Sequence, residues 1–579
     1  MICRTTTAWT KKEVDKNLVR TVANKHSCDP LTAFILVSRG FTDDEAVRYM
    51  LTDDNRLFHD PFLLPDIAKA IQRIQKAKAN QEKILVFGDR DVDGITGTAL
   101  LAGYLQGLGI EVSWRIPVGD ESYGLSVQAV DDFASAGGNL IITVDCGITA
   151  HDEINHANGL GIDVIITDHH TPKETLPDAV AIVNPKLPQS AYPFPDLCGC
   201  AVAFKLVCAL QTALGNEGIS DYPQKENAYI QLAALGTVAD IVPLVNENRL
   251  IVRRGIQAIM EKPRYGLSEL LITLGLAGKR ITAKELAWLV CPAINAAGRM
   301  GCPDKALNLL LETDPLKRIN LAKEIKAMNE KRRRLGAKEL PVIEQAASES
   351  RSQFDGKLAL AAGENISRGV TGIMANRLIE RFNIPVMVVH FGKDIAIGSI
   401  RSPGNYDIRL LLEPADDILL NWGGHTDALG FSLRRSLWEQ FTDRLEIEVG
   451  YIRCIDMADS EPLSIDAELP HAYITPDIYS IVDRFEPYGI GNEPLVFASG
   501  GLKIIALAVL GKTEPKHLKI TVGTDKYRWP AIFWNATEYA RTEIKAGDTV
   551  DMAYSFDRDS YRKAETPQML IRDIRKSGA

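Results

Sequence analysis

The chain has 579 residues, of which 46% are hydrophobic and 24% are charged, and this composition excludes an intrinsically disordered chain. A chain of this length exceeds what one hydrophobic core supports, and at roughly 150 residues per domain it predicts about four domains. The formal net charge of −9 provides no overall attraction to nucleic acid, although a binding groove can still be locally basic.

The sequence shows no sign of a membrane or secretory segment. No apolar run approaches the ~18 residues that a membrane span needs, and residues 1–16 contain no apolar core of the signal-peptide kind. The nine cysteines form no C-x-x-C pair, so neither a zinc ribbon nor a redox motif is expected. We therefore expect a soluble, cytoplasmic protein with no membrane association and with reduced, buried cysteines.

Residues 1–80 are expected to form an N-terminal helical segment, and residues 81–313 an α/β domain. In the second segment, short apolar runs at 83–89, 139–145 and 163–170 each end in an acidic residue and are separated by helical stretches. Uniformly apolar strands that alternate with helices indicate a parallel sheet. Ligands bind beyond the carboxyl ends of the strands in such sheets, where these runs place their polar residues.

The second half of the chain divides into three further parts. Residues 314–350 predict a long connecting helix with Asp314 as its cap and Pro315 in its first turn, although Gly336 and Pro341 are potential interruptions. This helix is rich in Lys and Arg, which suits either a solvated connector or a phosphate-facing one. Residues 351–454 predict a second α/β domain, and residues 455–579 predict a small β-barrel, for which an OB-fold is the candidate.

The first cluster of candidate ligands is Asp89, Asp91 and Asp93 in the run Gly88-Asp-Arg-Asp-Val-Asp-Gly94. At spacings of two, the carboxylates point to one side if the chain is still extended after the strand. Clustered carboxylates repel one another unless a cation compensates, and oxygen ligands suit Mg²⁺ or Mn²⁺. A calcium EF-hand is excluded because its twelfth position is Leu100 here instead of Glu. A surface acidic turn is the simpler alternative.

Three later segments offer further ligands. Asp145 follows the second apolar run, where a helix N-cap is the ordinary interpretation of a lone Asp. His169 and His170 follow Asp168 at the end of the third run, and neutral imidazole suits Mn²⁺. Asp240 interrupts an apolar stretch, where an Asp is rarely found unless it is paired or bound to a metal.

Taken in order, D-x-D-x-D-G, D-C-G, D-H-H and the A-D-I-V-P segment resemble the four motifs of the DHH phosphoesterase superfamily. Gly423-Gly424-His425 resembles the GGH signature of the associated DHHA1 substrate-binding domain. Over nearly its whole length the chain is similar to the RecJ family of single-stranded-DNA exonucleases. This likeness rests on further motifs at 123–125, 294–301, 398–402 and 487–492.

The resemblance implies a site that holds two divalent cations, Mn²⁺ or Mg²⁺, with Asp145 in the bridging place. It implies the following metal ligands: Asp89, Asp91, Asp93, Asp145, His169 and Asp240. It also implies that His170 lies behind the metal ligands or against the scissile phosphate. The resemblance further implies that the phosphate groups of the substrate are bound by Arg299, Arg401 and His425. It adds two substrate-binding residues in the same motifs, Asn295 and Ser402.

The implied function is hydrolysis of single-stranded DNA in the 5′→3′ direction with release of 5′-mononucleotides, in DNA recombination and repair. The implied partners are single-stranded DNA, a single-strand-binding protein and a helicase. In the barrel, the candidate contacts to the strand are Lys512, Lys516, His517, Lys519, Tyr527 and Trp534, although core packing is the favoured role of Trp534.

Two departures from the family pattern and two alternative functions accompany this interpretation. Arg90 replaces the usual Tyr of the first motif, and Ile366-Ser367 replaces a Trp-His pair in the second domain. One alternative is a related hydrolase of pyrophosphate, short oligonucleotides or cyclic dinucleotides, against which the long helix and the barrel argue. The other is a catalytically inactive DNA-binding scaffold, against which the filled ligand positions argue.

Overall fold

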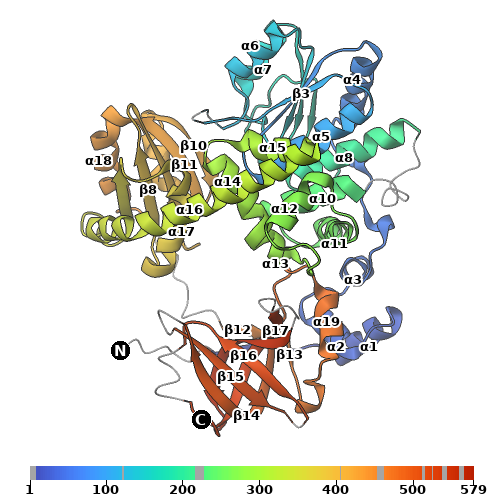
Figure 1. Cartoon of the computed structure of the whole chain (residues 1–579), viewed down its shortest axis with the longest axis vertical. Helices are drawn as coiled ribbons and strands as arrows, with labels where there is room; N and C mark the ends of the chain where they lie inside the picture. Colours follow the sequence, from blue (N-terminus) through green and yellow to red (C-terminus); the bar gives the residue numbers. More distant parts are fainter. Residues whose placement is uncertain are drawn as a thin grey trace.

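The computed structural model describes residues 8–119, 121, 123–215, 227–404, 406–452, 462–511, 516–524, 526–536, 544–559 and 566–578. Figure 1 shows two α/β bodies joined by one long helix, α16, with a β-barrel below them. Among these residues, no helix is both long enough and apolar enough to cross a membrane.

The first body is built on a five-stranded sheet in the order β3-β2-β4-β5-β6, and every pairing in it is parallel. Its strands are β2 (Ile84–Gly88), β3 (Val112–Arg115), β4 (Leu140–Val144), β5 (Asp163–Thr167) and β6 (Ala181–Val183). β2 and β4 are buried throughout. Helices cover both faces, which explains the uninterrupted apolar runs and confirms the expected parallel sheet.

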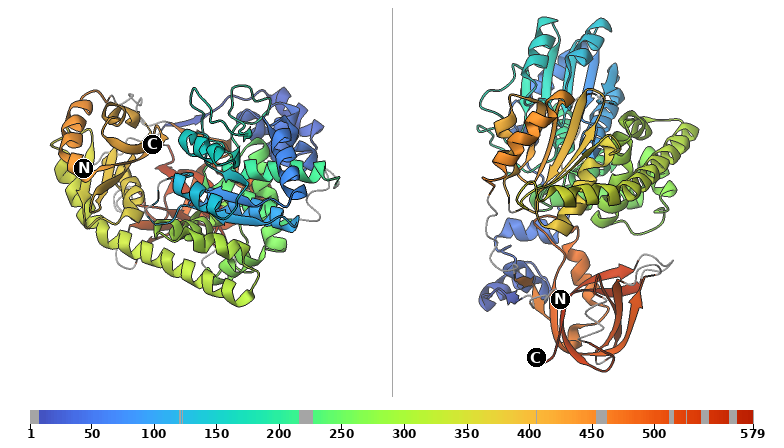
Figure 2. Two further views of the ribbon diagram at one scale, coloured as in Figure 1. Left: turned by 90° about the horizontal axis from the view of Figure 1, so that it is seen from above. Right: turned by 90° about the vertical axis from the view of Figure 1, so that its left-hand side faces the viewer.

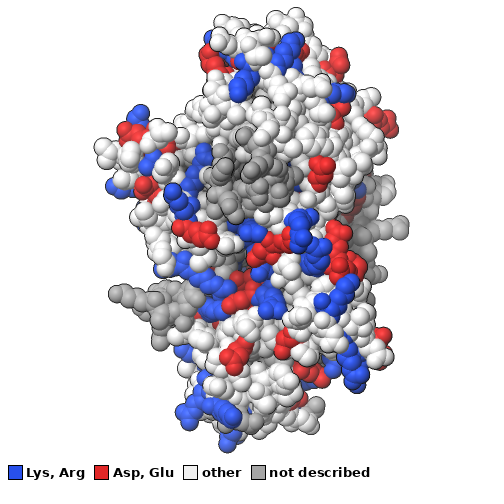
Figure 3. All heavy atoms as spheres, turned by 90° about the vertical axis from the view of Figure 1, so that its right-hand side faces the viewer, with Lys and Arg blue, Asp and Glu red and all other residues white. Residues whose placement is uncertain are grey.

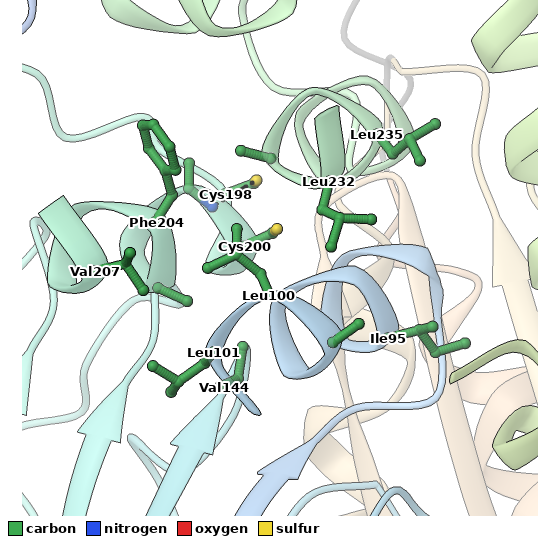
Figure 4. Packing of buried hydrophobic residues seen from close by; sticks show 14 of the residues in the cluster. Ile95, Leu100, Leu101, Val144, Cys198, Cys200, Phe204, Val207, Leu232 and Leu235 are labelled. Carbon is green, nitrogen blue, oxygen red and sulfur yellow. Dashed lines mark hydrogen bonds between the residues drawn. The ribbon is translucent and has the colours of Figure 1, made fainter. Parts of the chain in front are cut away.

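The core of this body lies between the sheet and three apolar helices, α5 (Val92–Gly107), α8 (Gly199–Ala213) and α10 (Asn227–Ala239). Figure 4 shows Leu100 and Leu101 of α5 beside Phe204 and Val207 of α8, with Val144 of β4 close by. Because α5 starts directly after the β2 edge, this packing fixes the position of the first acidic motif.

Further helices complete the first body. They are α4 (Ile67–Ala79), α6 (Val127–Ser135), α7 (His151–Gly159), α11 (Asn246–Glu261), α12 (Tyr265–Thr273), α13 (Ala283–Glu285), η4 (Leu286–Val290), α14 (Cys291–Arg299) and α15 (Pro303–Leu311). η4 is a π-helical turn that leads directly into α14.

The connecting helix α16 (Pro315–Ser350) is continuous, so neither Gly336 nor Pro341 interrupts it. The Asp314 carboxylate accepts hydrogen bonds from Leu316 N at 2.8 Å and Lys317 N at 3.0 Å, as expected for an N-cap. Seen from above in Figure 2, α16 runs along one side of both α/β bodies and spans them.

The second body contains a mixed sheet in the order β10-β11-β9-β8-β7. Its elements are β7 (Ala359–Gly363), η5 (Arg368–Val370), α17 (Thr371–Phe382), β8 (Val386–Phe391), β9 (Ile395–Arg401), η6 (Ile408–Leu411), η7 (Glu413–Ala415), β10 (Leu419–His425), β11 (Ala428–Arg434), η8 (Arg435–Leu437) and α18 (Trp438–Glu448). Only β7 and β8 pair in parallel.

The C-terminal part is a closed five-stranded barrel. Its strands are hydrogen-bonded in the order β14 (Phe497–Leu510), β15 (His517–Gly523), β16 (Arg528–Phe533), β18 (Thr566–Lys576) and β17 (Thr549–Asp559). β17 also pairs with β14, which closes the barrel. Closure leaves no open edge between these strands, as expected for an OB-fold. The short elements beside the barrel are β12 (Leu463–Ile465), β13 (Ala467–Glu468), η9 (His471–Tyr473) and α19 (Ile478–Phe485).

The N-terminal helical segment divides between two cores. α4 packs in the first body, whereas α1 (Lys16–Lys25), α2 (Pro30–Ser38) and α3 (Asp44–Leu51) contribute buried side chains to the barrel core. β1 (Trp9–Lys11) pairs in parallel with β12. The turns η1 (Asn55–Leu57) and η2 (Pro61–Leu63) lie between α3 and α4. The chain therefore starts on the barrel that its own C-terminal part forms (Figure 1).

One fully buried arginine joins the first body to this composite barrel domain. Arg249 of α11 donates hydrogen bonds to six carbonyl groups, which belong to Tyr49, Met50, Arg484, Phe485, Glu486 and Pro487. The acceptors come from the end of α3, from the end of α19 and from the two residues that follow α19. A single guanidinium group therefore satisfies carbonyls from two segments more than 400 residues apart.

We predict that Arg249→Met lowers the free energy of unfolding by about 3 kcal/mol or more, because it leaves several buried carbonyls without a donor. Urea unfolding and limited proteolysis at the junction near residues 484–487 measure the effect. Arg20→Met, an identical change on the exposed face of α1, is the control and should change the unfolding free energy little. Equal stability of the two variants would contradict the role assigned to Arg249.

Candidate metal centre

The polar residues that follow β2, β4 and β5 meet at one edge of the sheet. Gly88 is level with Val144, and Val144 is level with Thr167, so the residues after these strands leave the sheet side by side. Asp145 adopts a positive φ of 61° and donates its N–H to the Thr167 carbonyl at 3.0 Å. It caps no helix, because α7 starts at His151 with Ala150 as its N-cap.

The first acidic motif does not stay extended over its whole length, so the condition for three carboxylates at strand-like spacing is not met. Asp91 is the N-cap of α5 and accepts a hydrogen bond from Gly94 N at 3.1 Å, and Asp93 lies in the first turn of that helix. A side chain at Gly94 would place its Cβ 2.5 Å from Asp89 N and Asp89 O. The helix therefore starts tightly against the strand end, and its first turn carries two of the three carboxylates.

All six predicted metal ligands converge at this edge. Their ligand atoms form two groups within 4.8 Å, Asp89-Asp91-Asp145 and Asp93-His169-Asp240, and Asp145 also groups with His169 and His170. The Nε2 atom of His169 lies 3.1 Å from Asp145 Oδ1, 3.7 Å from Asp240 Oδ2 and 3.9 Å from Asp93 Oδ2. Asp145 therefore stands between the two groups of acids.

The N-terminus of α8 forms a cradle for Asp93 that sequence reasoning missed. The Asp93 carboxylate accepts hydrogen bonds from Gly199 N at 2.6 Å and Cys200 N at 3.0 Å. A Cβ at Gly199 would lie 2.5 Å from the Cβ of Asp145. The only signal for this contact in the sequence was a glycine between two cysteines at the start of an apolar helix.

Asp168 organises the two histidines without being a predicted ligand itself. Its buried carboxylate accepts hydrogen bonds from His169 N at 2.7 Å and Ile148 N at 3.0 Å, and it contacts His170 Nδ1 at 2.7 Å. Burial lowers the pKa of His170, but the hydrogen bond to Asp168 outweighs this effect and raises that pKa to about 8. His170 is therefore held as a cation beside the acids.

The carboxylates are electrostatically strained in the absence of cations. Burial, reinforced by the charge of Asp91, raises the pKa of Asp89 to about 7. Burial and the charge of Asp93 raise the pKa of Asp240 to about 8, and burial also raises the pKa of Asp145 well above its usual value. Burial lowers the pKa of His169 to about 4, which keeps its imidazole neutral. Bound cations would reverse the penalty on the carboxylates.

The donor set fits divalent cations. Asp89 Oδ1 and both ring nitrogens of His169 are buried and make no hydrogen bond, so these atoms are left for another partner. Carboxylate oxygens with one neutral imidazole suit Mn²⁺, and Mg²⁺ shares the preference for oxygen. Two groups of acids that share Asp145 can hold two such cations.

Two predicted phosphate-binding arginines lie at the boundary between the α/β bodies. A Cβ at Gly369 would lie 2.1 Å from the Arg299 carbonyl oxygen, and one at Gly372 would lie 2.9 Å from the Arg401 guanidinium group. Burial, with the charge of Arg401 as a second cause, lowers the pKa of Arg299. The two like charges are therefore close, and within the described chain no carboxylate forms an ion pair with either.

The other three predicted substrate-binding residues are placed differently. Asn295 Oδ1 accepts a hydrogen bond from Val92 N at 3.2 Å, so this side chain positions the start of α5. Ser402 is buried, and its hydroxyl donates a hydrogen bond to the Tyr406 carbonyl at 3.5 Å. β10 includes His425, but the side chain of His425 lies outside what the structure describes.

Both departures from the family pattern serve packing at the edges of the site. Arg90 donates a hydrogen bond to the Glu121 carbonyl at 2.7 Å. Ile366 is buried and its carbonyl accepts a hydrogen bond from His390 Nδ1 at 2.6 Å, while the Ser367 hydroxyl donates to Glu339 Oε1 of α16 at 2.6 Å. The Ser367 contact joins the second body to the connecting helix.

A largely apolar cavity of about 870 Å³ lies between the first body and the barrel domain. Its lining includes Ile241, which directly follows Asp240, and Asn295. It also includes Trp288 of η4, whose side chain is 76% exposed, and Arg558 of the barrel. The cavity therefore runs from the residues on either side of Asp240, Ala239 and Ile241, towards the barrel, and none of the six predicted metal ligands lines it.

The charged surface gives no continuous basic stripe on the face that Figure 3 shows, because Lys and Arg lie among Asp and Glu there. On the barrel, Trp534 is 54% exposed and packs edge-on against His517 with ring centroids 4.7 Å apart. The expectation that Trp534 packs in the core was therefore wrong. Lys512 lies outside the described residues, whereas Tyr527 is partly exposed.

We predict that cation affinity rises as the pH increases from about 6 to about 8. The raised pKa values of about 7 for Asp89 and about 8 for Asp240 mean that both carboxyls are protonated at the lower pH, and a binding cation must displace those protons. Calorimetric titration with Mn²⁺ in buffers of different ionisation enthalpy measures both the affinity and the proton release. Affinity that does not change over this range would contradict the electrostatic account.

We predict that Gly199→Ala lowers Mn²⁺ affinity by about tenfold or more, because the added Cβ must displace Asp145 or the start of α8, and such displacements typically cost 1–3 kcal/mol. Calorimetry measures the affinity, and circular dichroism checks the fold. Gly107→Ala at the end of α5 is the control, since a Cβ there meets no atom within 4 Å. Unchanged affinity in Gly199→Ala would show that the close contact is not required.

Comparison with known proteins matches three parts of the chain to family models. Residues 83–237 match the DHH family, N-terminal domain; residues 355–449 match the DHHA1 domain; and residues 465–573 match the RecJ OB domain. These segments correspond to the parallel-sheet body, the mixed-sheet body and the barrel.

Full-length relatives agree with these matches. The chain is 32% identical to the single-stranded-DNA-specific exonuclease RecJ of Bacillus subtilis, over 98% of this chain and 70% of the relative. It is 34% identical to RecJ of Escherichia coli, over 88% of this chain and 90% of the relative. The crystal structure of RecJ from Thermus thermophilus in complex with Mn²⁺ superposes with a TM-score of 0.80 at 29% identity, covering 100% of this chain and 80% of that one. The chain belongs to the RecJ family of metal-dependent, single-stranded-DNA-specific exonucleases.

Proposed function

We propose that the chain degrades single-stranded DNA in the 5′→3′ direction by two-metal hydrolysis and releases 5′-mononucleotides. The observation that carries the chemistry is the position of Asp145 between two groups of acids at one sheet edge. Polarity and product follow the family resemblance, while the ligand set follows the geometry of the described residues. Two bound divalent cations would supply an activated water and offset the charge on the attacking and leaving oxygens.

The protein side chains hold and orient the reactants. The proposed metal ligands are Asp89, Asp91, Asp93, Asp145, His169 and Asp240. Asp168 fixes the backbone of the histidine loop and keeps His170 protonated, so the His170 imidazolium is available to a phosphate oxygen. Arg299 and Arg401 are the proposed anchors for phosphate groups, because paired guanidinium groups without an acidic partner favour an anionic ligand.

We attribute the preference for single strands over duplex to the path between the first body and the barrel. The cavity beside Asp240 offers an apolar wall with Trp288, on which an unstacked base can lie, and the barrel continues the track with Trp534 and Tyr527. Base stacking on aromatic side chains contributes about 1–3 kcal/mol per base. A duplex has no free base faces to offer to this path.

We propose the following division of labour along the chain: an N-terminal segment at 1–80, catalysis at 81–313, connection at 314–350, substrate binding at 351–454 and strand binding at 455–579. The proposed setting is recombination and repair in the cytoplasm, with a helicase and a single-strand-binding protein as partners. The packing of α1, α2 and α3 into the barrel core assigns part of 1–80 to the strand-binding domain.

We predict that Asp145→Ala lowers the rate of hydrolysis at least about a thousandfold, because it removes the carboxylate shared by both groups of acids, while binding of single strands persists. End-labelled oligonucleotides, single- and double-stranded, are digested with Mn²⁺, with Mg²⁺ and with chelator. Asp152→Ala, an exposed residue of α7, is the control. Hydrolysis retained in Asp145→Ala, or degradation of duplex as fast as single strand, would refute the proposal. Turnover of dinucleotides alone would favour the small-substrate alternative.

A further inference from the structure

A fourth strand delivers residues to the metal edge, in addition to the three recognised from sequence. β6 pairs in parallel with β5, and Thr167 is level with Val183. Asp168 N donates a hydrogen bond to the Val183 carbonyl at 3.1 Å, so the ladder continues past the end of β5. The residues that follow β6 therefore run beside the loop that carries His169 and His170.

The turn after β6 is fixed to the histidine loop by one buried side chain. Asn184 is fully buried, and its Nδ2 donates a hydrogen bond to the His170 carbonyl at 2.9 Å. Its Oδ1 accepts a hydrogen bond from Lys186 N at 2.8 Å. Leu187 is buried in the apolar core on the other side of the turn. The backbone of Lys186 thus has a defined position relative to the metal ligands.

Lys186 brings a positive charge to this turn, which lies beside the histidine loop. It is half-buried, and in the described part of the chain its ammonium group has no hydrogen-bond or ion-pair partner. From this fixed turn the flexible Lys186 side chain can reach the second group of acids. In agreement, after burial and nearer charges, its charge is a minor cause that lowers the pKa of His169 and partly offsets the raised pKa of Asp240.

An unpaired ammonium group beside proposed metal ligands has one natural partner in the reaction. The carboxylates there are assigned to cations, whereas the phosphodiester brings uncompensated negative charge to the same edge. We propose that the Lys186 ammonium group contacts a non-bridging oxygen of the scissile phosphodiester. It thereby offsets the charge that grows on that phosphate during hydrolysis. This inference rests on the proposed function.

The proposed step moves no proton to or from Lys186. The water oxygen forms a bond to phosphorus, the bond from phosphorus to the 3′ oxygen of the terminal nucleotide breaks, and that oxygen leaves as a hydroxyl. Lys186 remains protonated throughout. A lysine suits this place because its ammonium group is a compact charge with three donors on a flexible stem.

The first test compares Lys186→Gln with Lys186→Arg on a single-stranded oligonucleotide at saturating Mn²⁺. Loss of a charge-assisted contact lowers kcat/KM about 10- to 100-fold in Lys186→Gln, and Lys186→Arg recovers part of the loss. Lys83→Gln, which changes a similarly half-buried lysine at the opposite edge of the same sheet, is the control and retains the wild-type rate. A wild-type rate for Lys186→Gln overturns the inference.

The second test asks whether the lost contact is to the scissile phosphate. Substrates with one phosphorothioate of defined configuration at the first linkage are compared in the wild type and in Lys186→Gln. For one diastereomer, sulfur slows the wild type by a certain factor. That factor is smaller in Lys186→Gln by about threefold or more, because the Lys186 side chain and the replaced oxygen act together. Identical sulfur effects in both proteins overturn the inference, even if Lys186→Gln is less active.

Two further readouts separate this role from others. If Lys186 only tuned the ligands, Lys186→Gln would need a different Mn²⁺ concentration for half-maximal rate and would match the wild type at saturation, which also overturns the inference. Unfolding in urea shows whether the variant is folded. Failure of the proposed function looks different, because the wild type itself would then show no metal-dependent hydrolysis of single strands.

Discussion

The structure depends on one electrostatic constraint: several carboxylates are buried together at the edge of a parallel sheet. Left alone they repel one another, and burial raises the pKa values of Asp89, Asp145 and Asp240. Cations remove this penalty, so the fold and the metal requirement are coupled. The repulsion between these carboxylates without cations therefore favours the binding of metal ions.

Much of the surrounding structure serves to keep these groups close. Glycines at 94 and 199 allow backbone to approach the acids within distances that any side chain would prevent. The first amides of α8 point at Asp93, where a helix N-terminus favours negative charge. Asp168 accepts a hydrogen bond from the histidine loop, and Asn184 donates one to it from the turn after β6, so both fix the position of this loop. Supporting residues therefore matter to the chemistry as much as the ligands do.

The sequence predicted the parallel sheet and the ligand set because each signal is local: an apolar run followed by an acid. Contacts made by backbone, such as the α8 amides on Asp93, leave no comparable pattern in the side chains. Asp91 and Asp93 lie in a cap and a helical turn because α5 starts sooner than strand-like spacing suggested. The helices at the N-terminus resemble any amphipathic helices, so nothing in them indicated packing against a barrel more than 400 residues away. The prediction that Trp534 packs in the core was wrong because hydrophobicity alone does not distinguish a buried aromatic side chain from an exposed one.

The arrangement also explains why one chain contains such different domains. The sheet edge supplies the chemistry, the second body brings the charge of Arg401 close to Arg299, and the barrel lines one side of the cavity that includes the neighbours of Asp240. The most direct measurement of the central claim is an anomalous difference map from a crystal soaked in Mn²⁺. Two peaks about 3.5–4 Å apart on either side of Asp145 are the predicted result. A map without peaks at this sheet edge, or with its peaks elsewhere in the molecule, would contradict the account.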